Sequence, residues 1–260
     1  MRLGLGIAAG PDPETLAPLA TEAEGLGYDS IWSNDSPAGD GLAQLASWAH
    51  VSTHVQLGVG VLALDRHRPE DIAARVRELG LPLGRLIIGL GAGFTRTPLE
   101  VVRAGVAELR RHLPEARLAV AAMGPKMCEL GGEVGDAVLL NWMTPERAVW
   151  ARQKVEAGSA RAGKQPDDVT IFGYVRTALG ADAGERLQRE VSMYLQMPAY
   201  ARHFQNMGAD PESVGVTATT SASVAGALNQ YSVMDEPVAR VLSHRTVADV
   251  MAVARAAIGA

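Results

Sequence analysis

Eight short aliphatic runs recur along the 260-residue chain, each followed by a segment with helix signals, and this alternation constrains the fold more than any other feature. The runs are nearly continuous in Val, Ile, Leu, Ala and Gly, which is typical of parallel strands buried on both faces. They cover residues 3–8, 29–33, 55–62, 85–91, 117–122, 136–141, 169–175 and 237–243, the last being the weakest. The repeats predict an α/β fold, a (β/α)8 TIM barrel, as one domain over residues 1–260.

The segments between the runs begin with helix start signals. "TPLE" at residues 97–100 places Thr97 at an N-cap and Glu100 three residues later, which is a capping box with proline at the first helical position. Residues 176–236 separate the seventh run from the eighth and break the rhythm. Within this extra segment, residues 213–230 are rich in Ser, Thr and Ala, a composition that fits either a mobile loop or a lid over the barrel mouth.

A dinucleotide-binding domain is the alternative that the stretch "RLIIGLGAGF" at residues 85–94 raises. The G-x-G-x-x-G fingerprint fits at Gly89 and Gly91, but its third position falls on Phe94. No acidic residue closes a clear second strand about twenty residues later. The barrel is therefore favoured over the doubly wound sheet.

Composition excludes several classes of function. The apolar share of 47% allows a sizeable core, and the net charge of −5 without basic runs disfavours a nucleic-acid partner. No stretch reaches the length of a membrane span, and the N-terminus does not resemble a signal peptide. Cys128 is the only cysteine, which suits the cytoplasm because no disulfide can form within the chain.

Glycines alternate with bulky residues in three of the predicted strands. Side chains alternate between the two faces of a strand, so each of these strands has one bare face. The bare face either lets small residues fill a narrowing barrel interior or lets a flat ligand approach the backbone, and the recurrence in three strands favours the ligand. The glycines are Gly4, Gly6, Gly58, Gly60, Gly89 and Gly91, of which the last three are candidate cofactor-binding residues.

Two neighbouring helix starts follow the fifth and sixth runs. "MGPK" opens one helix, with Met123, Gly124 and Lys126 at its start, and "NWMTPE" opens the next, with Asn141 and Thr144. Helix N-termini present free backbone N–H groups and the positive end of the helix dipole, which suits phosphate. The pair predicts an anchor for a phosphorylated cofactor.

Several of these stretches together resemble the bacterial-luciferase-like superfamily of flavin- and deazaflavin-dependent oxidoreductases. The most specific stretch, "GPKMCELGGEVGDAVLLN", is similar to the F420-dependent branch that includes methylenetetrahydromethanopterin reductase. The resemblance runs in order along nearly the whole chain. The stretches that carry it are residues 23–35, 55–76, 84–93, 124–141 and 194–208.

The resemblance implies a barrel whose mouth holds coenzyme F420 or, alternatively, FMN. It implies a bulge with a non-proline cis peptide at Gly60–Val61 that supports the cofactor ring. The remaining positions that it implies for the cofactor are Asp35 near the ring, and Met123, Gly124, Asn141 and Thr144 near the phosphate.

The chain departs from the family pattern in three places. Ser36 stands where the family often has a histidine, Arg68 replaces a histidine before proline, and the usual insertion after the fourth strand is shortened. The nearest histidine to Arg68 is His67. Substrate and catalytic base therefore do not carry over from the family.

The predicted function is an oxidoreductase that transfers a hydride between F420 and a small organic substrate, at a C=C, C=N or alcohol/carbonyl group. The alternatives are an FMN-dependent monooxygenase and a cofactor-free barrel that acts as a binding protein. Asp35 and His67 are the candidate catalytic proton donors, because each follows the C-terminal end of a predicted strand. No metal site is expected. A homodimer is expected, because apolar residues such as Trp48 exceed what a single subunit needs for its own packing and would contribute to a dimer interface.

Overall fold

The computed structural model describes residues 1–10, 12–242 and 246–260. Eight parallel strands form a closed ring, because β6 pairs with β7 as well as with β5. The order around the ring is β1, β2, β3, β4, β5, β6, β7 and β9, which confirms the predicted (β/α)8 TIM barrel and excludes the open dinucleotide-binding sheet. The strands are β1 Gly4–Gly6, β2 Ser30–Ser33, β3 Gln56–Ala63, β4 Leu86–Gly91, β5 Arg117–Ala122, β6 Ala137–Asn141, β7 Thr170–Leu179 and β9 Glu236–Val241, with β8 Val216–Ala218 outside the ring.

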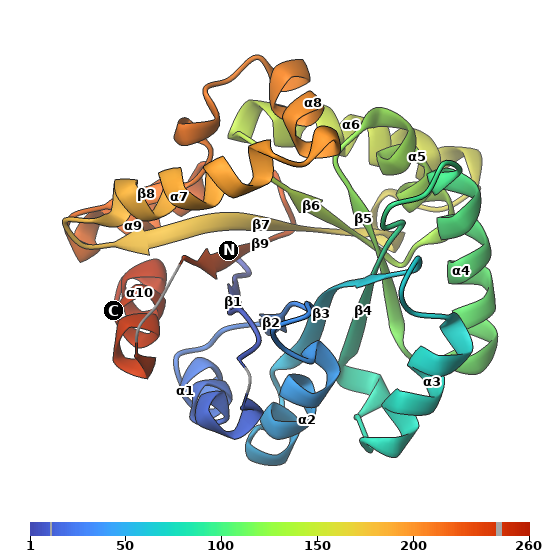
Figure 1. The fold of residues 1–260 in the computed structure, drawn as a ribbon, viewed down its shortest axis with the longest axis horizontal. Coiled ribbons are helices and arrows are strands. Elements are labelled where there is room, and N and C mark those ends of the chain that lie inside the picture. Colours follow the sequence, from blue (N-terminus) through green and yellow to red (C-terminus); the bar gives the residue numbers. More distant parts are fainter. Residues whose placement is uncertain (11, 243–245) are drawn as a thin grey trace.

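Helices surround the strands on the outside of the ring (Figure 1). Prolines in their first turns begin most of them, as the start signals predict. No helix among the described residues is long and apolar enough to cross a membrane. The helices are α1 Pro18–Gly25, α2 Gly41–Val51, α3 Pro69–Glu78, α4 Pro98–His112, α5 Pro125–Val134, α6 Pro145–Arg161, α7 Ala183–Leu195, α8 Pro198–Met207, α9 Val224–Asn229 and α10 Val247–Ile258.

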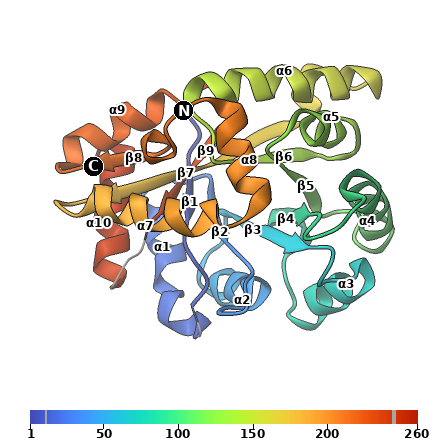
Figure 2. The same ribbon diagram turned by 45° about the horizontal axis from the view of Figure 1, so that its top comes forward.

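The segment between β7 and β9 contains α7, α8, β8 and α9 (Figure 2). The Ser/Thr-rich stretch 213–230 is therefore not an irregular loop. It contains β8, which pairs with the end of β7, and α9. It is α8 that lies at the barrel mouth, where Phe204 packs against Trp142 at the end of β6. A single helix, α4, connects β4 with β5, in line with the shortened insertion. The last residue of the eighth predicted run, 243, lies outside the described residues.

The inward glycines make room for the protein's own side chains. A Cβ on Gly58 would lie 2.3 Å from the Trp32 indole, and one on Gly60 would lie 2.3 Å from the Tyr174 hydroxyl. One on Gly6 would lie 3.0 Å from Cδ of Arg240. The expectation that a flat ligand packs on this bare wall is wrong at Gly6 and Gly58, since large interior side chains already fill the space, whereas the role predicted for Gly60 concerns the backbone of its cis peptide and stays a prediction.

The other glycines of the wall serve the bulge in β3. The register between β3 and β4 shifts between Gly60 and Leu62, and the Gly60–Val61 peptide is cis, as the family resemblance implies. A Cβ on Gly89 would lie 2.5 Å from the Val59 carbonyl oxygen, and one on Gly91 would lie 2.9 Å from the Val61 side chain. Both glycines of β4 therefore allow the bulged strand to pass close to them.

Candidate active site

The C-terminal ends of the strands bring together residues from distant parts of the sequence at the mouth of the barrel. Beneath the bulge of β3, the hydroxyl of Tyr174 lies 3.3 Å from the Gly60 carbonyl oxygen and 3.4 Å from that of Ser33. Burial raises the pKa of Tyr174 far above its usual value, so the phenol stays protonated and donates to these carbonyls. The cis peptide is thus held from below by a hydrogen bond from β7.

Asp35 and His67, predicted separately, are in direct contact. His67 Nε2 lies 2.9 Å from Asp35 Oδ2, and Arg66 Nη2 lies 3.4 Å from the same oxygen. Oδ1 of Asp35 accepts from the Gly41 amide at 3.4 Å. The carboxylate is mostly buried and the imidazole is half-buried. Together they form a pair that can hold a proton at the barrel mouth and present it to a ligand.

The helix starts after β5 and β6 are arranged as predicted. Gly124 is the N-cap of α5 and has extended backbone angles, φ −97° and ψ 163°. Thr144 is the N-cap of α6, where its hydroxyl oxygen accepts from the Arg147 amide at 3.1 Å. Met123, which precedes Gly124, is half-buried at the end of β5. The two helices begin beside each other because β5 and β6 are paired.

An arginine that sequence reasoning missed lies in the first turn of α6. The guanidinium of Arg147 stacks over the Trp150 ring at 3.4 Å from its centroid, and its buried Nε has no hydrogen-bond partner within the described part of the chain. No described carboxylate is within ion-pair distance of it. Burial lowers the pKa of the Arg147 guanidinium.

Cys128 lies in α5, close to Arg147. Burial raises the pKa of the Cys128 thiol to about 12, although the nearby Arg147 charge opposes this shift. Cys128 is therefore a buried thiol and not a nucleophile.

The side chain of Asn141 is already engaged by the protein. Its Oδ1 accepts from Nη1 of Arg176, whose guanidinium lies 3.9 Å from the centre of the Trp142 ring and whose Nε lies 3.2 Å from Glu190 Oε1. Trp142 itself is fully buried. Asn141, one of the predicted cofactor-binding residues, therefore contacts a cluster of side chains within the protein that come from β6, β7 and α7.

Lys126 lies apart from the mouth. Its exposed side chain lines a cavity of about 310 Å³ on the outside of the barrel, between α4, α5 and α6. Arg103 and Glu133 in this cavity form an ion pair at 2.6 Å. The role predicted for Lys126 in cofactor binding stays a prediction.

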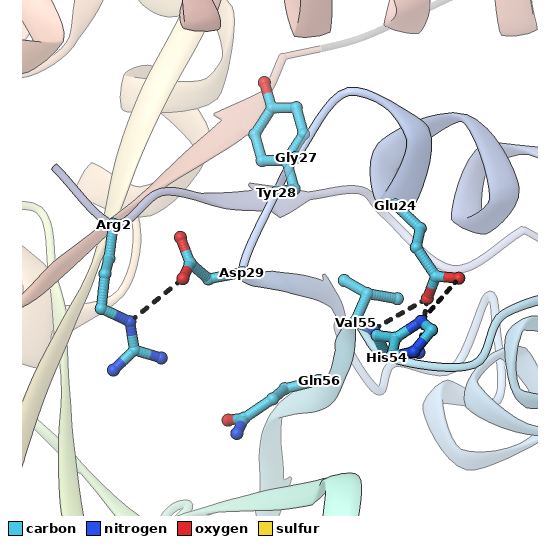
Figure 3. Close-up of a pocket in the computed structure, with 8 residues that line it drawn as sticks. All are labelled: Arg2, Glu24, Gly27, Tyr28, Asp29, His54, Val55 and Gln56. Atoms are coloured by element: carbon cyan, nitrogen blue, oxygen red, sulfur yellow. Dashed lines mark hydrogen bonds and ion pairs between the residues drawn. The ribbon is translucent and has the colours of Figure 1, made fainter.

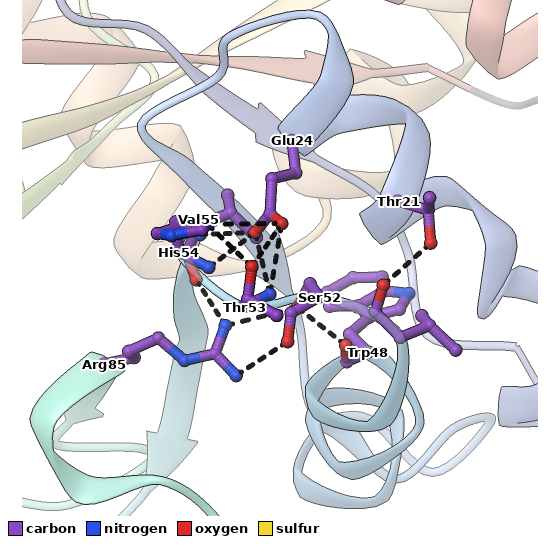
Figure 4. Close-up of polar contacts among 9 residues, drawn as sticks. Thr21, Glu24, Trp48, Ser52, Thr53, His54, Val55 and Arg85 are labelled. Atoms are coloured by element: carbon purple, nitrogen blue, oxygen red, sulfur yellow. Dashed lines mark hydrogen bonds and ion pairs between the residues drawn. The ribbon is translucent and has the colours of Figure 1, made fainter.

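A second cavity, of about 450 Å³, lies at the N-terminal ends of the strands (Figure 3). Arg2, Asp29 and Gln56 line it together with His54, and this end of a TIM barrel serves stability more often than chemistry. Glu24 also lines this cavity, and its carboxylate accepts hydrogen bonds from the Thr53, His54 and Val55 amides and from the Thr53 hydroxyl (Figure 4). Burial acts to raise the pKa of Glu24, but these hydrogen bonds outweigh it and lower the pKa to about 2.

Sequence reasoning missed Asn34, Tyr174, Arg176 and Arg240 as well as Arg147. Asn34 Oδ1 accepts from the Ala9 amide at 3.2 Å and from Arg240 Nη2 at 3.3 Å. For Arg176 and Arg240, the sequence did contain a signal, because each is an arginine within an otherwise aliphatic run. In a strand that is buried on both faces, such an arginine indicates a polar group inside the barrel.

The family model for luciferase-like monooxygenases matches residues 1–119 and 97–257 of the chain. The chain is also 26% identical over 220 residues to the 5,10-methylenetetrahydromethanopterin reductase of Methanolobus tindarius. That alignment spans 71% of this chain and 68% of the reductase.

Two solved structures share the fold. An F420-dependent secondary alcohol dehydrogenase in complex with an F420-acetone adduct matches with a TM-score of 0.77 at 16% identity, over 97% of both chains. The oxygenating constituent of 3,6-diketocamphane monooxygenase from Pseudomonas putida, in complex with FMN, matches with a TM-score of 0.67 at 12% identity, over 94% of this chain and 92% of that one. The two structures support the fold, and the family model spans nearly the whole sequence. The chain therefore belongs to the luciferase-like monooxygenase family of enzymes.

Proposed function

We propose that this enzyme is an oxidoreductase that transfers a hydride between coenzyme F420 and a small organic substrate, at a C=C, C=N or alcohol/carbonyl group. The similarity to the Methanolobus reductase and the F420-bound dehydrogenase of the same fold support F420 as the cofactor. The observation that carries the proposal is the open helix start at Gly124 after β5, at the same end of the barrel as the Asp35–His67 pair after β2 and β3.

Gly124 is a glycine that the protein itself does not need. Its backbone angles are ones that any residue adopts, and no atom lies within 4 Å of the position that a Cβ would occupy. A side chain there would extend into open space beside the first amides of α5. A ligand phosphate bound to those amides would require that space, so the residues present fit a phosphorylated cofactor.

Arg147 and Thr144 complete the proposed phosphate anchor. The Thr144 hydroxyl caps α6 with its oxygen, which leaves its proton free to donate to a ligand. Arg147 contributes a half-buried positive charge without a described carboxylate partner, and a phosphate oxygen would satisfy its unpaired Nε. Burying a guanidinium in this way without a counter-ion is costly unless an anion binds.

When bound, the deazaflavin supplies the hydride chemistry. Gly60 and Val61, fixed from below by Tyr174, would support the ring. Asp35 and His67 would hold the proton that is delivered to, or removed from, the substrate atom next to the reacting carbon. Because the imidazole is the more exposed member of the pair, it is the group that would contact the substrate, and Asp35 would orient it.

The test is a fluorescence titration of the purified protein with F420 and, separately, with FMN. Tight binding of F420 with much weaker binding of FMN is expected. Preferential binding of FMN would contradict the F420 assignment and favour a flavin-dependent monooxygenase, the alternative that the FMN-bound neighbour of the same fold supports. Binding of neither would contradict both.

We also propose a homodimer, although not on the basis of Trp48. That side chain is fully buried within the subunit, and its Nε1 donates to the Leu16 carbonyl at 2.9 Å, so it is not surplus surface. Light scattering at micromolar concentrations is expected to give twice the mass of one chain.

A further inference from the structure

Arg240 on β9 extends into the barrel mouth, where it contacts two oxygen acceptors and no carboxylate among the described residues. Its Nη1 donates to the Val241 carbonyl at 3.0 Å and its Nη2 to Asn34 Oδ1 at 3.3 Å. The side chain is half-buried beside Gly6, whose missing Cβ leaves room for it. In the part of the chain that the structure describes, no carboxylate lies within ion-pair distance of this guanidinium, so most of its donors remain available.

The sheet places a second positive charge beside it. Arg240 is the register partner of Arg176 on β7, so the two side chains leave adjacent strands on the same face. Arg176 is paired with Glu190, at 3.2 Å. The described residues therefore give this corner of the mouth two guanidinium groups and one carboxylate. Neighbouring like charges on adjacent strands are unfavourable unless an anion compensates them.

The corner lies on the reacting side of the mouth. Asn34, which accepts a hydrogen bond from Arg240, immediately precedes Asp35 of the Asp35–His67 pair. In the closed ring, β1 and β2 stand opposite β5 and β6, where the helix starts with Gly124 and Thr144 lie, and β9 is separated from β6 by β7. A cofactor anchored at those helix starts would leave Arg240 free for a different ligand.

We infer that Arg240 binds an anionic group of the substrate, a carboxylate or a phosphate, and so places the reducible carbon beside the Asp35–His67 pair. The inference rests on the proposed function for the identity of the reaction, but not for the anion site. A planar guanidinium binds carboxylate or phosphate through two parallel N–H donors, and Asn34 holds Arg240 in position for this. The substrate class is thus a small organic acid or phosphate ester with a reducible or oxidisable centre.

The test compares the wild type with Arg240→Gln, Arg240→Lys and, as a matched control, Arg189→Gln. Arg189 is an exposed arginine on α7 with only a long 3.7 Å contact to Glu185. Titrations with F420, followed by fluorescence, and with inorganic phosphate and benzoate as anion probes, followed by calorimetry, are done on the apoprotein and again at saturating F420. Circular dichroism and thermal melting establish that each variant is folded.

At least one anion probe is expected to bind the wild type, and to bind Arg240→Gln at least tenfold more weakly, with partial recovery in Arg240→Lys and no change in Arg189→Gln. Affinity for F420 is expected to remain within about twofold. Unchanged anion binding in folded Arg240→Gln overturns the inference, as does absence of anion binding in the wild type. An equal loss of F420 affinity also overturns it, because the cofactor's own phosphate would then occupy the site. If the wild type binds no F420 but Arg240-dependent anion binding persists, the proposed cofactor fails and the anion site stands.

Discussion

Replacing Gly124 with valine tests the phosphate anchor directly. The Val side chain meets no protein atom within 4 Å at its Cβ, and the φ of −97° is acceptable for a branched residue. The fold should therefore tolerate the change. Valine is a poorer N-cap than glycine, so a loss of unfolding free energy of roughly 1 kcal/mol or less is expected.

Cofactor binding should respond far more strongly than stability. The valine methyl groups would crowd the first amides of α5, and loss of a charge-assisted hydrogen bond to phosphate costs about 1.5–3 kcal/mol. Since about 1.4 kcal/mol is a factor of ten, the F420 dissociation constant should rise by roughly ten- to hundredfold.

The assay is a fluorescence titration of wild type, Gly124→Val and Gly84→Val. Gly84 is a matched control because its Cβ position is equally open, and it precedes β4 at the opposite end of the barrel. Only Gly124→Val should lose affinity, with thermal midpoints of all three proteins within a few degrees. Unchanged F420 affinity in a folded Gly124→Val would refute the reasoning, because the phosphate would then bind elsewhere.

Three further predictions concern the proton pair, the barrel interior and acid stability. His67→Gln should slow single-turnover hydride transfer at least tenfold while F420 affinity is retained, and Asp35→Asn should slow it less. If both variants lose only F420 affinity, the Asp35–His67 pair serves cofactor binding instead of proton transfer. Gly58→Ala should reduce the free energy of unfolding by about 1–3 kcal/mol in denaturant titrations, because the added methyl group meets the Trp32 indole, and an unchanged midpoint would show that the interior is not close-packed there. Glu24 has a folded pKa of about 2 against an ordinary 4.5, so its stabilising effect is complete above about pH 4.5 and is lost as the pH falls toward 2. The thermal midpoint of the wild type should therefore exceed that of Glu24→Gln at pH 6 and converge with it near pH 2, and a difference that persists at pH 2 would contradict this.

Much of the fold and part of the site follow from local sequence alone. The eight aliphatic runs and the prolines that begin the helices determine strand–helix alternation, because burial on both faces and helix capping are decided within a few residues. The helix starts at Gly124 and Thr144 follow for the same reason. The prediction of a cis peptide at Gly60–Val61 needed the family resemblance, since no local rule singles out this bond.

Tertiary structure alone decided what occupies the space beside the glycines and which polar side chains meet. Gly58 and Trp32 lie on neighbouring strands, and alternation along one strand does not reveal whether a ligand or an indole fills the bare face. Asp35 reaches His67 because β2 pairs with β3, and Arg240 lies beside Arg176 because β9 pairs with β7, so both contacts depend on strand pairing and register. Strand periodicity assigns a side chain to a face, whereas its partner across the barrel depends on closure, stagger and packing of the whole interior.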